Sequence, residues 1–281
     1  MSFKSGFVTI IGNPNVGKSS LFNAILNFEL SVVTQKSQTT RNSIKGIITT
    51  DNFQIVLSDT PGHVESLYLL HDKMNKNIYS SLEGSDIILY VTDVKEKKIN
   101  QKLLDAVLNL QIPIIYLVNK SDLDKKYKLI KNNLFRDMFL VSSNFKKDID
   151  KILTTIVKYL PNHPAFYSKE ELTDKNERFI VSEIVRGEIF RSFSQEVPYS
   201  SHVEINKFKN EEKLLWIEGY IYVETESQKS ILLGKKGNKI KDLSKKSRTL
   251  IEEIYNKKVY INFTIKVLKW RSNKKFLFSK F

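Results

Sequence analysis

The chain has 281 residues, of which 41% are hydrophobic. This is enough for two domains of roughly 100 to 170 residues, each with its own core. The absence of cysteine excludes disulfides and thiolate metal sites, and suits a reducing compartment. The net charge is +14, and residues 228–281 hold 16 basic but only 3 acidic residues, as expected for a surface that meets phosphates. No apolar run approaches the length of a membrane span, so we expect a cytoplasmic protein.

Short apolar strands alternate with amphipathic helices through the first part of the chain. We expect strands at 7–12, 44–50, 53–58, 86–92, 112–118 and 137–142. This alternation predicts an α/β fold with a mostly parallel sheet and helices on both faces. Loops at the carboxyl ends of such strands line the binding crevice, and the motifs of the first part all lie there.

The first motif directly follows the first strand and fits the pattern G-x-x-x-x-G-K-[ST] of a phosphate-binding loop. Backbone N–H groups of such a loop close around phosphates, and the next helix points its N-terminus at them. Lys18 is expected to reach the β- and γ-phosphates, and Ser19 to place its hydroxyl on Mg²⁺. The predicted nucleotide contacts of this loop are Gly12, Asn13, Pro14, Asn15, Val16, Gly17, Lys18 and Ser19.

A polar segment at residues 37–41 separates the first helix from the second strand. A threonine here can complete the Mg²⁺ shell only while a γ-phosphate is present, which would make the segment a switch. We assign Thr40 to the metal, with Thr39 as the alternative. An ordinary polar loop is the other interpretation of this segment.

The third strand runs into Asp59-Thr60-Pro61-Gly62, which fits the pattern D-x-x-G. Asp59 can hold Mg²⁺ through water, and the Gly62 N–H can contact the γ-phosphate. The pattern alone is also typical of a common turn. Its position after a phosphate-binding loop makes the nucleotide interpretation specific.

The fifth strand runs into Asn119-Lys120-Ser121-Asp122, which fits N-K-x-D. The Asp122 carboxylate can accept hydrogen bonds from guanine N1–H and from the exocyclic amine together. Adenine offers no such pair of donors, and an unpaired buried carboxylate is costly, so the motif selects GTP over ATP. Ser142 and Ser143 follow the next strand and can offer a backbone N–H to guanine O6.

Two prolines within residues 160–165 interrupt helical periodicity, and we place a domain boundary there, giving domains 1–165 and 166–281. Asp174 and Glu177 are spaced as a capping box that opens a helix over 175–194. We then expect strands at 201–208 and 214–224, a short helix near 228–233, a long helix over 238–255 and a strand at 258–268.

A Gly-Lys-Lys-Gly loop separates the short helix from the long one. Its glycines let the backbone approach a phosphate, both flanking helix termini face it, and such a loop clamps about four nucleotides. A helix–helix turn is the alternative, but the surrounding lysines favour RNA. The predicted RNA contacts are Gly234, Lys235, Lys236, Gly237, Lys239, Lys241 and Lys245.

With these residues in place the chain resembles the Era family of bacterial GTPases. The resemblance rests on G-x-P-N-V-G-K-S at 12–19, Q-T-T-R at 38–41, D-T-P-G at 59–62, N-K-x-D at 119–122 and G-K-K-G at 234–237. It covers nearly the whole chain. It implies a Ras-like P-loop GTPase domain joined to a type II KH domain that binds the 3′ end of 16S ribosomal RNA during assembly of the 30S subunit.

Two of the next three residues depart from the family pattern, and Asn15, which fits it, suggests a further cofactor. His63 occupies a position where the family usually has an apolar residue, and it resembles the histidine that positions water in translation GTPases; an exposed loop histidine is the alternative. Asn15 resembles an asparagine that ligates potassium in some relatives, which makes K⁺ a candidate cofactor beside Mg²⁺. Ser143 stands where alanine is usual, with a modest expected effect because the contact is through the backbone.

The sequence thus predicts a GTP hydrolase whose nucleotide controls RNA binding, with Lys18, Gly62 and His63 as candidate catalytic residues. Turnover should be slow, because no arginine finger can be identified. Two alternatives stay open: a non-hydrolysing RNA-binding assembly factor that uses GTP only as a conformational ligand, and a GTPase acting on transfer RNA or a membrane. Residues 276–278 suggest weak peripheral contact with the inner face of the cell membrane or a packed tail. We expect a monomer.

Overall fold

The chain folds into two compact units in the computed structural model. One unit comprises Met1–Leu67 with His71–Asp174, and the other comprises Tyr68–Leu70 with Lys175–Phe281. The structure describes residues 2–34, 36, 39–63, 69–96, 99–129 and 132–273. The predicted segment 276–278, and residues 37 and 38 of the predicted switch, lie outside these residues. No described helix has both the length and the apolarity that a membrane crossing requires.

The first unit is built on a six-stranded sheet in the order β2-β3-β1-β4-β5-β6. β2 pairs antiparallel with β3, and every other pairing is parallel. The strands are β1 (Lys4–Ile11), β2 (Ile44–Thr49), β3 (Phe53–Asp59), β4 (Ile87–Asp93), β5 (Ile114–Asn119) and β6 (Asp137–Leu140). The predicted mostly parallel sheet is confirmed, and each strand overlaps its predicted range.

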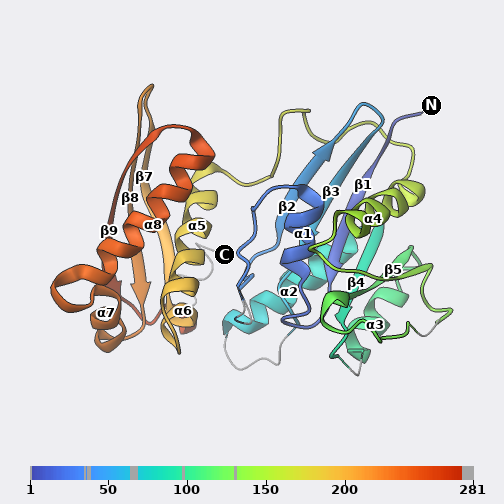
Figure 1. The fold of residues 1–281 in the computed structure, drawn as a ribbon, viewed down its shortest axis with the longest axis horizontal. Helices are drawn as coiled ribbons and strands as arrows, with labels where there is room; N and C mark the ends of the chain where they lie inside the picture. Colours follow the sequence, from blue (N-terminus) through green and yellow to red (C-terminus); the bar gives the residue numbers. More distant parts are fainter. Residues whose placement is uncertain are drawn as a thin grey trace. The chain divides into compact units, whose positions relative to one another are not determined.

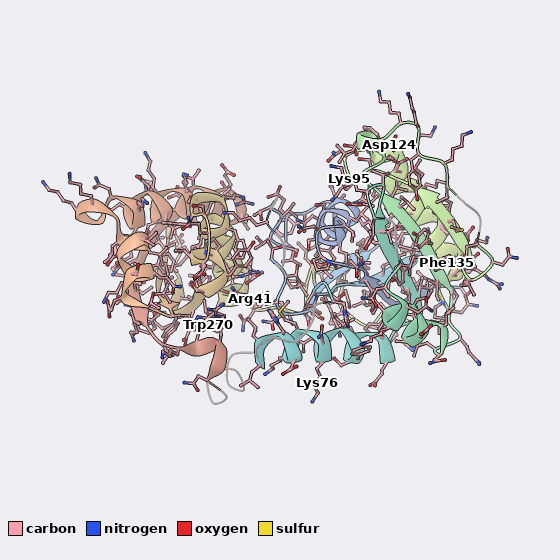
Figure 2. The ribbon with its side chains drawn as sticks, turned by 90° about the horizontal axis from the view of Figure 1, so that it is seen from below. Arg41, Lys76, Lys95, Asp124, Phe135 and Trp270 are labelled. Carbon is pink, nitrogen blue, oxygen red and sulfur yellow. The ribbon has the colours of Figure 1, made fainter. Side chains whose placement is uncertain are left out.

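Helices cover both faces of this sheet (Figure 1). α1 (Lys18–Leu26) packs beside α4 (Lys146–Tyr159). α2 (Leu69–Glu83) and α3 (Gln101–Leu108) share a core with β4 and β5, and the exposed Lys76 of α2 points away from the sheet (Figure 2). Because β1, β3, β4 and β5 are parallel, their carboxyl ends lie at one edge of the sheet, where the loops that follow them can converge.

The segment that follows α4 lies along the edge of the first unit. The side-chain oxygen of Gln54 accepts hydrogen bonds from the N–H groups of Phe166 (2.7 Å) and Tyr167 (3.0 Å). Its amide nitrogen donates to the Tyr167 carbonyl at 2.9 Å. The division between residues 165 and 166 stays a prediction.

The predicted capping box at Asp174 is wrong. α5 (Glu177–Ser192) is capped by Asn176, whose side chain accepts from the Phe179 N–H at 2.9 Å. Asp174 instead accepts a hydrogen bond from the Lys45 N–H at 3.3 Å. Asn176 is also a strong cap residue, and the carboxylate of Asp174 has a partner on the edge strand β2.

The second unit is a three-stranded sheet in the order β7-β8-β9, with β7 antiparallel and β9 parallel to β8. Helices α5 and α8 lie over one face of it (Figure 1), and their apolar side chains share its core. Besides α5, its elements are α6 (Val197–Ser200), β7 (His202–Asn210), β8 (Leu214–Val223), α7 (Glu226–Leu233), a 3-10 turn (Lys235–Gly237), α8 (Asn238–Tyr255), β9 (Lys258–Val267) and a final 3-10 turn (Trp270–Ser272).

The predicted α-β-β-α-α-β order is confirmed, with the short helix α6 added. α7 begins two residues earlier than predicted. Thr225 caps it in a capping box with Gln228, in which each side chain bonds the backbone of the other residue.

Candidate functional site

The loop between β1 and α1 is held in a conformation that its glycines make possible. Gly12 has a φ of +147°, and a Cβ there would lie 2.1 Å from the Val91 carbonyl oxygen. Gly17 has a φ of +93°, and a Cβ there would lie 2.2 Å from the Asn119 side-chain nitrogen. Any other residue would clash as well as adopt a strained backbone. The loop is therefore fitted closely against the ends of β4 and β5.

Lys18 is buried inside this loop. Its Nζ donates to the carbonyl oxygens of Gly12 (3.0 Å) and Asn13 (2.9 Å). Burial lowers the pKa of Lys18 to about 8, although the charges of Asp59 and Glu96 act in the opposite direction. A buried ammonium group bonded only to neutral carbonyl oxygens in these two contacts favours an anionic ligand, because the anion would balance its positive charge.

The three residues predicted to hold a metal come together at the start of α1. The Asp59 Oδ2 accepts hydrogen bonds from the hydroxyls of Ser19 (2.6 Å) and Thr40 (3.2 Å). The two hydroxyl oxygens are 2.9 Å apart. Asp59 is fully buried, and its Oδ1 has no hydrogen-bond partner among the described residues. Burial raises the pKa of this carboxyl. An oxygen-only donor set with an unpartnered carboxylate oxygen fits Mg²⁺.

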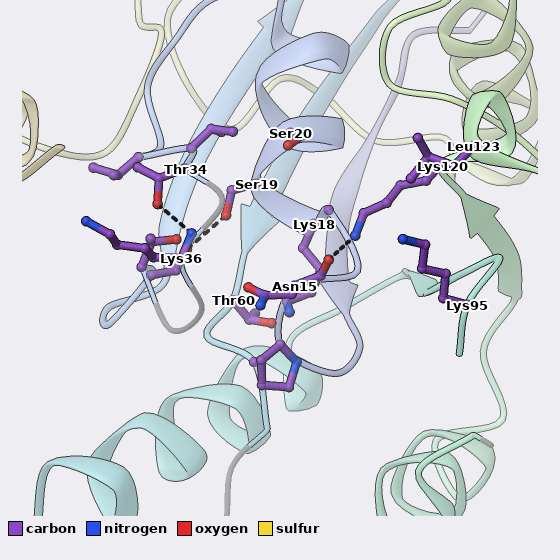
Figure 3. A pocket seen from close by; sticks show the side chains of 17 residues that line it. Asn15, Lys18, Ser19, Ser20, Thr34, Lys36, Thr60, Lys95, Lys120 and Leu123 are labelled. Carbon is purple, nitrogen blue, oxygen red and sulfur yellow. Dashed lines mark hydrogen bonds between the residues drawn. The ribbon is translucent and has the colours of Figure 1, made fainter. Parts of the chain in front are cut away.

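A pocket of about 570 Å³ opens beside the loop (Figure 3). Its lining includes most of the loop, with Thr39, Thr40, Thr60, Gly62 and Lys120. Sequence reasoning missed several lining residues: Ser20, Val32, Val33, Thr34, Lys36, Lys95 and Leu123. These residues belong to several separate segments and fit no sequence motif. They become neighbours only when the chain folds.

The segment after β3 rests directly on the phosphate-binding loop. Thr60 donates its hydroxyl to the Ile10 carbonyl at 2.6 Å. Gly62 packs so closely on Pro14 that an added Cβ would lie 2.8 Å from the Pro14 nitrogen and Cα atoms. Pro61 connects these two contacts along the chain. Through the contact of Gly62 with Pro14, the segment and the loop are packed against each other with no space for a larger residue.

Replacing Gly62 with alanine should separate this segment from the loop, because the colliding atoms belong to backbone. We expect Gly62→Ala to keep GDP affinity within a few-fold, to lose the tighter binding of a non-hydrolysable GTP analogue, and to lower hydrolysis about 100-fold, as loss of a transition-state donor does. Fluorescent-nucleotide titration and single-turnover assays measure these effects. Gly84→Ala is the matched control, since a Cβ there meets nothing within 4 Å. Normal nucleotide discrimination in Gly62→Ala would contradict the prediction.

His63 follows at the margin of the site and is not among the residues that line the pocket. Its Nδ1 lies 3.4 Å from the Asn100 side-chain nitrogen, and that nitrogen lies 3.4 Å from the Asn13 Oδ1. Burial, with a smaller effect of the Lys102 charge, lowers the pKa of His63 below its usual value. The ring is therefore neutral at neutral pH.

If His63 positions the attacking water, only its neutral form can do so. Because the pKa of His63 is lowered, the hydrolysis rate should be flat around neutral pH and fall on acidification below the usual histidine range near pH 6.5. His63→Ala should lower the single-turnover rate about 100-fold and remove this acidic decline, with GTP affinity unchanged. An unchanged rate in His63→Ala would assign the residue to the loop surface alone.

The N-K-x-D residues connect the phosphate-binding loop to the loop after β6. The buried Asn119 donates to the Val16 carbonyl at 3.0 Å and accepts from the Ser143 N–H at 3.2 Å. Asp122 accepts a hydrogen bond from the Ser142 hydroxyl at 2.6 Å. Asp122, Ser142 and Ser143 thus lie together, although none of them lines the pocket described above.

Lys120 and Ser121 make further contacts between these loops. Lys120 donates to the Asn15 carbonyl (Figure 3) and pairs with Asp93 at 2.8 Å. The Ser121 N–H donates to the Val141 carbonyl at 3.1 Å. The motif therefore fixes the relative position of three loops in addition to presenting Asp122.

Two acidic residues at the carboxyl end of β4 and just beyond it were not predicted as part of the site. Asp93 pairs with Lys120, and Glu96 accepts a hydrogen bond from the Asn13 side-chain amide. Burial raises the pKa of Glu96, and its Oε2 has no partner among the described residues. Their only sequence signal is their place at the carboxyl end of a strand.

The G-K-K-G loop in the second unit has the geometry that its glycines predict. Gly234 (φ +68°) and Gly237 (φ +75°) both adopt positive φ, and Lys236 between them is left-handed as well. The loop joins the C-terminus of α7 to the N-terminus of α8. The predicted lysines of the loop and of α8 are all exposed: Lys235, Lys236, Lys239, Lys241 and Lys245.

The fold and the first site define a P-loop GTPase, here joined to a KH-type unit. Residues 7–120 match the protein family described as "50S ribosome-binding GTPase", and residues 196–271 match the family described as "KH domain". The chain is 40% identical over 285 residues to "GTPase Era" of Clostridium kluyveri, covering 98% of this chain and 97% of that one. It is 39% identical over 286 residues to "GTPase Era" of Clostridium botulinum, with the same coverage.

Solved structures agree over the same length. Era in complex with MgGDPNP and nucleotides 1506–1542 of 16S ribosomal RNA is 32% identical, covers 98% of this chain and 97% of its own, and has a TM-score of 0.90. A substituted variant of Aquifex aeolicus Era bound to GDP·AlF4⁻ is 31% identical, covers 98% of both chains and also has a TM-score of 0.90. The chain belongs to the Era family of GTPases, and it is a GTPase. The predicted resemblance and fold class are confirmed.

Proposed function

We propose that the protein is a GTP-binding and GTP-hydrolysing switch that binds the 3′ end of 16S ribosomal RNA and acts in assembly and maturation of the 30S ribosomal subunit. The observation that carries the proposal is one chain joining the phosphate-binding pocket to the exposed G-K-K-G loop. The relative solved with MgGDPNP and 16S ribosomal RNA, which aligns over 98% of this chain, supports the RNA assignment. We assign residues 1–165 to a domain that binds the nucleotide and residues 166–281 to a domain that binds RNA.

Within the nucleotide domain, Lys18 contacts the β- and γ-phosphates, the Gly62 N–H contacts the γ-phosphate, and Asp122 selects guanine. The buried ammonium of Lys18 and the contact of Gly62 with Pro14 support the first two assignments. His63 orients the attacking water. The loop contacts the phosphates through its backbone, and Ser142 and Ser143 contact the base.

Ser19, Thr40 and Asp59 are the residues that would hold Mg²⁺, directly or through water. Bound there, the ion neutralises charge that develops on the phosphoryl oxygens during transfer. The hydroxyl of Thr40 ties its segment to Asp59, so this residue links the metal site to the residues around position 40.

Asn15 would ligate K⁺ beside the phosphates, because its backbone is left-handed (φ +67°) and its side chain lines the pocket. Potassium there would supply charge in place of an arginine finger. We expect replacing K⁺ with Na⁺ at constant ionic strength to slow single-turnover hydrolysis about tenfold or more, in the direction expected for a lost charge contact. Asn15→Ala should remove the difference between the two ions. Equal rates in K⁺ and Na⁺ would eliminate this assignment.

The RNA contacts are the backbone of Gly234 and Gly237 and the lysines of the loop and α8. Two left-handed glycines and two helix termini leave backbone approachable by phosphates, and the lysines add charge. We assign the protein to the cytoplasm as a monomer. Weak peripheral contact with the inner face of the cell membrane would involve residues 276–278, which lie outside the described residues.

Binding of a labelled 16S 3′-end fragment to the full protein tests the proposal. We expect the affinity to be higher with a non-hydrolysable GTP analogue than with GDP, and to fall at least tenfold in Lys235→Glu with Lys236→Glu. Lys147→Glu with Lys151→Glu is the control, because it makes the same change in net charge on exposed positions of α4. Equal affinity in both nucleotide states would overturn the switch, and equal loss in the control pair would reduce the RNA site to general charge.

A further inference from the structure

One face of the sheet of the second unit carries no described helix along Trp216 and Tyr260; at the other end of this face Trp270 packs on His202 of β7, with ring centroids 5.5 Å apart. Side chains alternate along β8: Leu215, Ile217 and Ile221 are buried, whereas Trp216 and Tyr220 are half-buried. The buried set packs in the core with α5 and α8. Successive side chains of a strand point to opposite faces, so the second set lies on the face away from these helices.

Two aromatic side chains form a pair on this face. Trp216 of β8 lies opposite Tyr260 of β9 in the strand register. Their ring centroids are 4.1 Å apart with planes tilted by 30°, and Tyr260 is 41% exposed. A third ring, Tyr220, lies farther along β8 and has the Lys266 Nζ 3.3 Å from its centroid. Large aromatic rings left exposed together mark a binding surface more often than scattered single ones do.

Lysines of both edge strands surround these rings. Lys209 lies opposite Trp216 on β7, and Lys258 and Lys266 lie on β9, all three exposed. None of the three forms an ion pair with a described residue. We call the set of Trp216, Tyr220, Tyr260, Lys209, Lys258 and Lys266 the aromatic face.

Two acidic groups of this face already have partners. Glu204 of β7, opposite Tyr220, is hydrogen-bonded to the Tyr222 side chain. The Glu218 carboxylate accepts from the Lys207 Nζ at 3.0 Å and from the Trp216 Nε1 at 2.6 Å. The Trp216 contact and then that of Lys207 lower the pKa of Glu218, so it stays ionised and paired. The remaining lysines therefore suit an anionic partner.

We propose that the aromatic face is a second RNA-binding surface, on which bases of unpaired nucleotides stack against the exposed Tyr260 and the Trp216 ring beside it while the lysines of the face meet the phosphates. Aromatic residues on adjacent strands with flanking cations are the arrangement by which sheets bind single-stranded RNA. The surface is separate from the G-K-K-G loop, which lies between two helices of the layer on the other side of the sheet. The choice of RNA rests on the proposed function.

Tryptophan fluorescence tests this surface, because the protein has only 2 tryptophans and the other, Trp270, is fully buried. We expect 12-nucleotide oligouridine to quench the emission, and Trp216→Phe to abolish the quenching. Lys258→Glu with Lys266→Glu should raise the oligouridine concentration at half-maximal quenching at least tenfold. Lys147→Glu with Lys151→Glu, on α4, is the control and should leave it unchanged. Circular dichroism melting verifies that each variant is folded.

A second variant separates this proposal from the G-K-K-G site. Lys235→Glu with Lys236→Glu should still show quenching, because the aromatic face is intact, although the anisotropy of labelled oligouridine reports weaker total binding. Loss of quenching in this variant would mean one site and overturn the proposal. Anisotropy without quenching in the wild type would overturn it too and point to a protein partner on this face. No binding of oligouridine by either readout would overturn the aromatic face, and binding of the labelled 16S 3′-end fragment then decides separately whether the RNA function stands.

Discussion

Lys18→Met should stabilise the nucleotide-free protein while it abolishes GTP binding. The pKa of Lys18 is lowered from 10.5 to about 8 in the folded state, so below pH 8 the fold holds a charge that it disfavours. The shift corresponds to about 3 kcal/mol, and its two hydrogen bonds to loop carbonyls reduce the gain to about 1–3 kcal/mol. We expect the melting temperature without nucleotide to rise by a few degrees, since each kcal/mol shifts it by about 2–4 °C.

When nucleotide is present the order of stability reverses, and the wild type is more stable than Lys18→Met. GTP at 1,000 times its dissociation constant stabilises the wild type by about 4.1 kcal/mol, which exceeds the gain of the variant, and leaves Lys18→Met unaffected. Between pH 8 and 10.5 the advantage of the variant should fade, because the folded wild type holds Lys18 neutral while the unfolded chain still binds the proton; above pH 10.5 the lysine is neutral in both states and the charge penalty is gone. Lys95→Met removes an exposed charge from the same pocket and should change little. A nucleotide-free Lys18→Met protein less stable than wild type would contradict the prediction.

Asp122→Asn should exchange guanine preference for xanthine preference. The carboxylate that accepts from Ser142 presents acceptors to the guanine N1–H and amine, whereas an amide presents one donor that opposes the amine. Losing a charged hydrogen bond and burying an unmatched donor costs about 3–5 kcal/mol, or roughly 10²–10⁴ in GTP affinity. Xanthine carries a carbonyl in place of the amine, so XTP should bind the variant at least tenfold tighter than GTP does.

Competition titration with GTP, ATP and XTP measures the change. Asp124→Asn is the matched control, because Asp124 is exposed and lies two residues beyond the motif. Its side chain accepts a hydrogen bond from the Lys126 N–H at 3.0 Å. It should keep wild-type preference. Equal weakening of GTP and XTP in Asp122→Asn would indicate that this residue supports the loop rather than reads the base.

The nucleotide site could be predicted from sequence because its chemistry is local. Glycines that a Cβ would drive into Val91 or Asn119, and a lysine and serine that open a helix, occupy fixed positions in one short segment. The strands were predictable because buried parallel strands are continuous apolar runs. Of the hydroxyls around Asp59, Ser19 was predicted, and the assignment of Thr40 over Thr39 is favoured by the short contacts of Thr40. Ser31, which donates to the same Asp59 oxygen at 2.7 Å, was missed.

What sequence reasoning missed depends on tertiary pairing. Asn176 rather than Asp174 caps α5 because Asp174 has its partner on β2, and no local pattern reveals that contact. Glu96 reaches Asn13 only after β1 and β4 have paired. The aromatic face was hidden for the same reason, since Trp216 and Tyr260 are far apart in sequence and become neighbours through strand register.

The most direct measurement of the central claim is crosslinking of the protein to RNA in cell extract, with a GTP analogue or GDP, followed by sequencing of the recovered fragments. We predict recovery of the 3′ end of 16S ribosomal RNA, enriched with the GTP analogue and lost in Lys235→Glu with Lys236→Glu. Diffuse RNA that does not depend on the nucleotide would contradict the account, and would leave a GTPase whose basic C-terminal region is general charge rather than a recognition site.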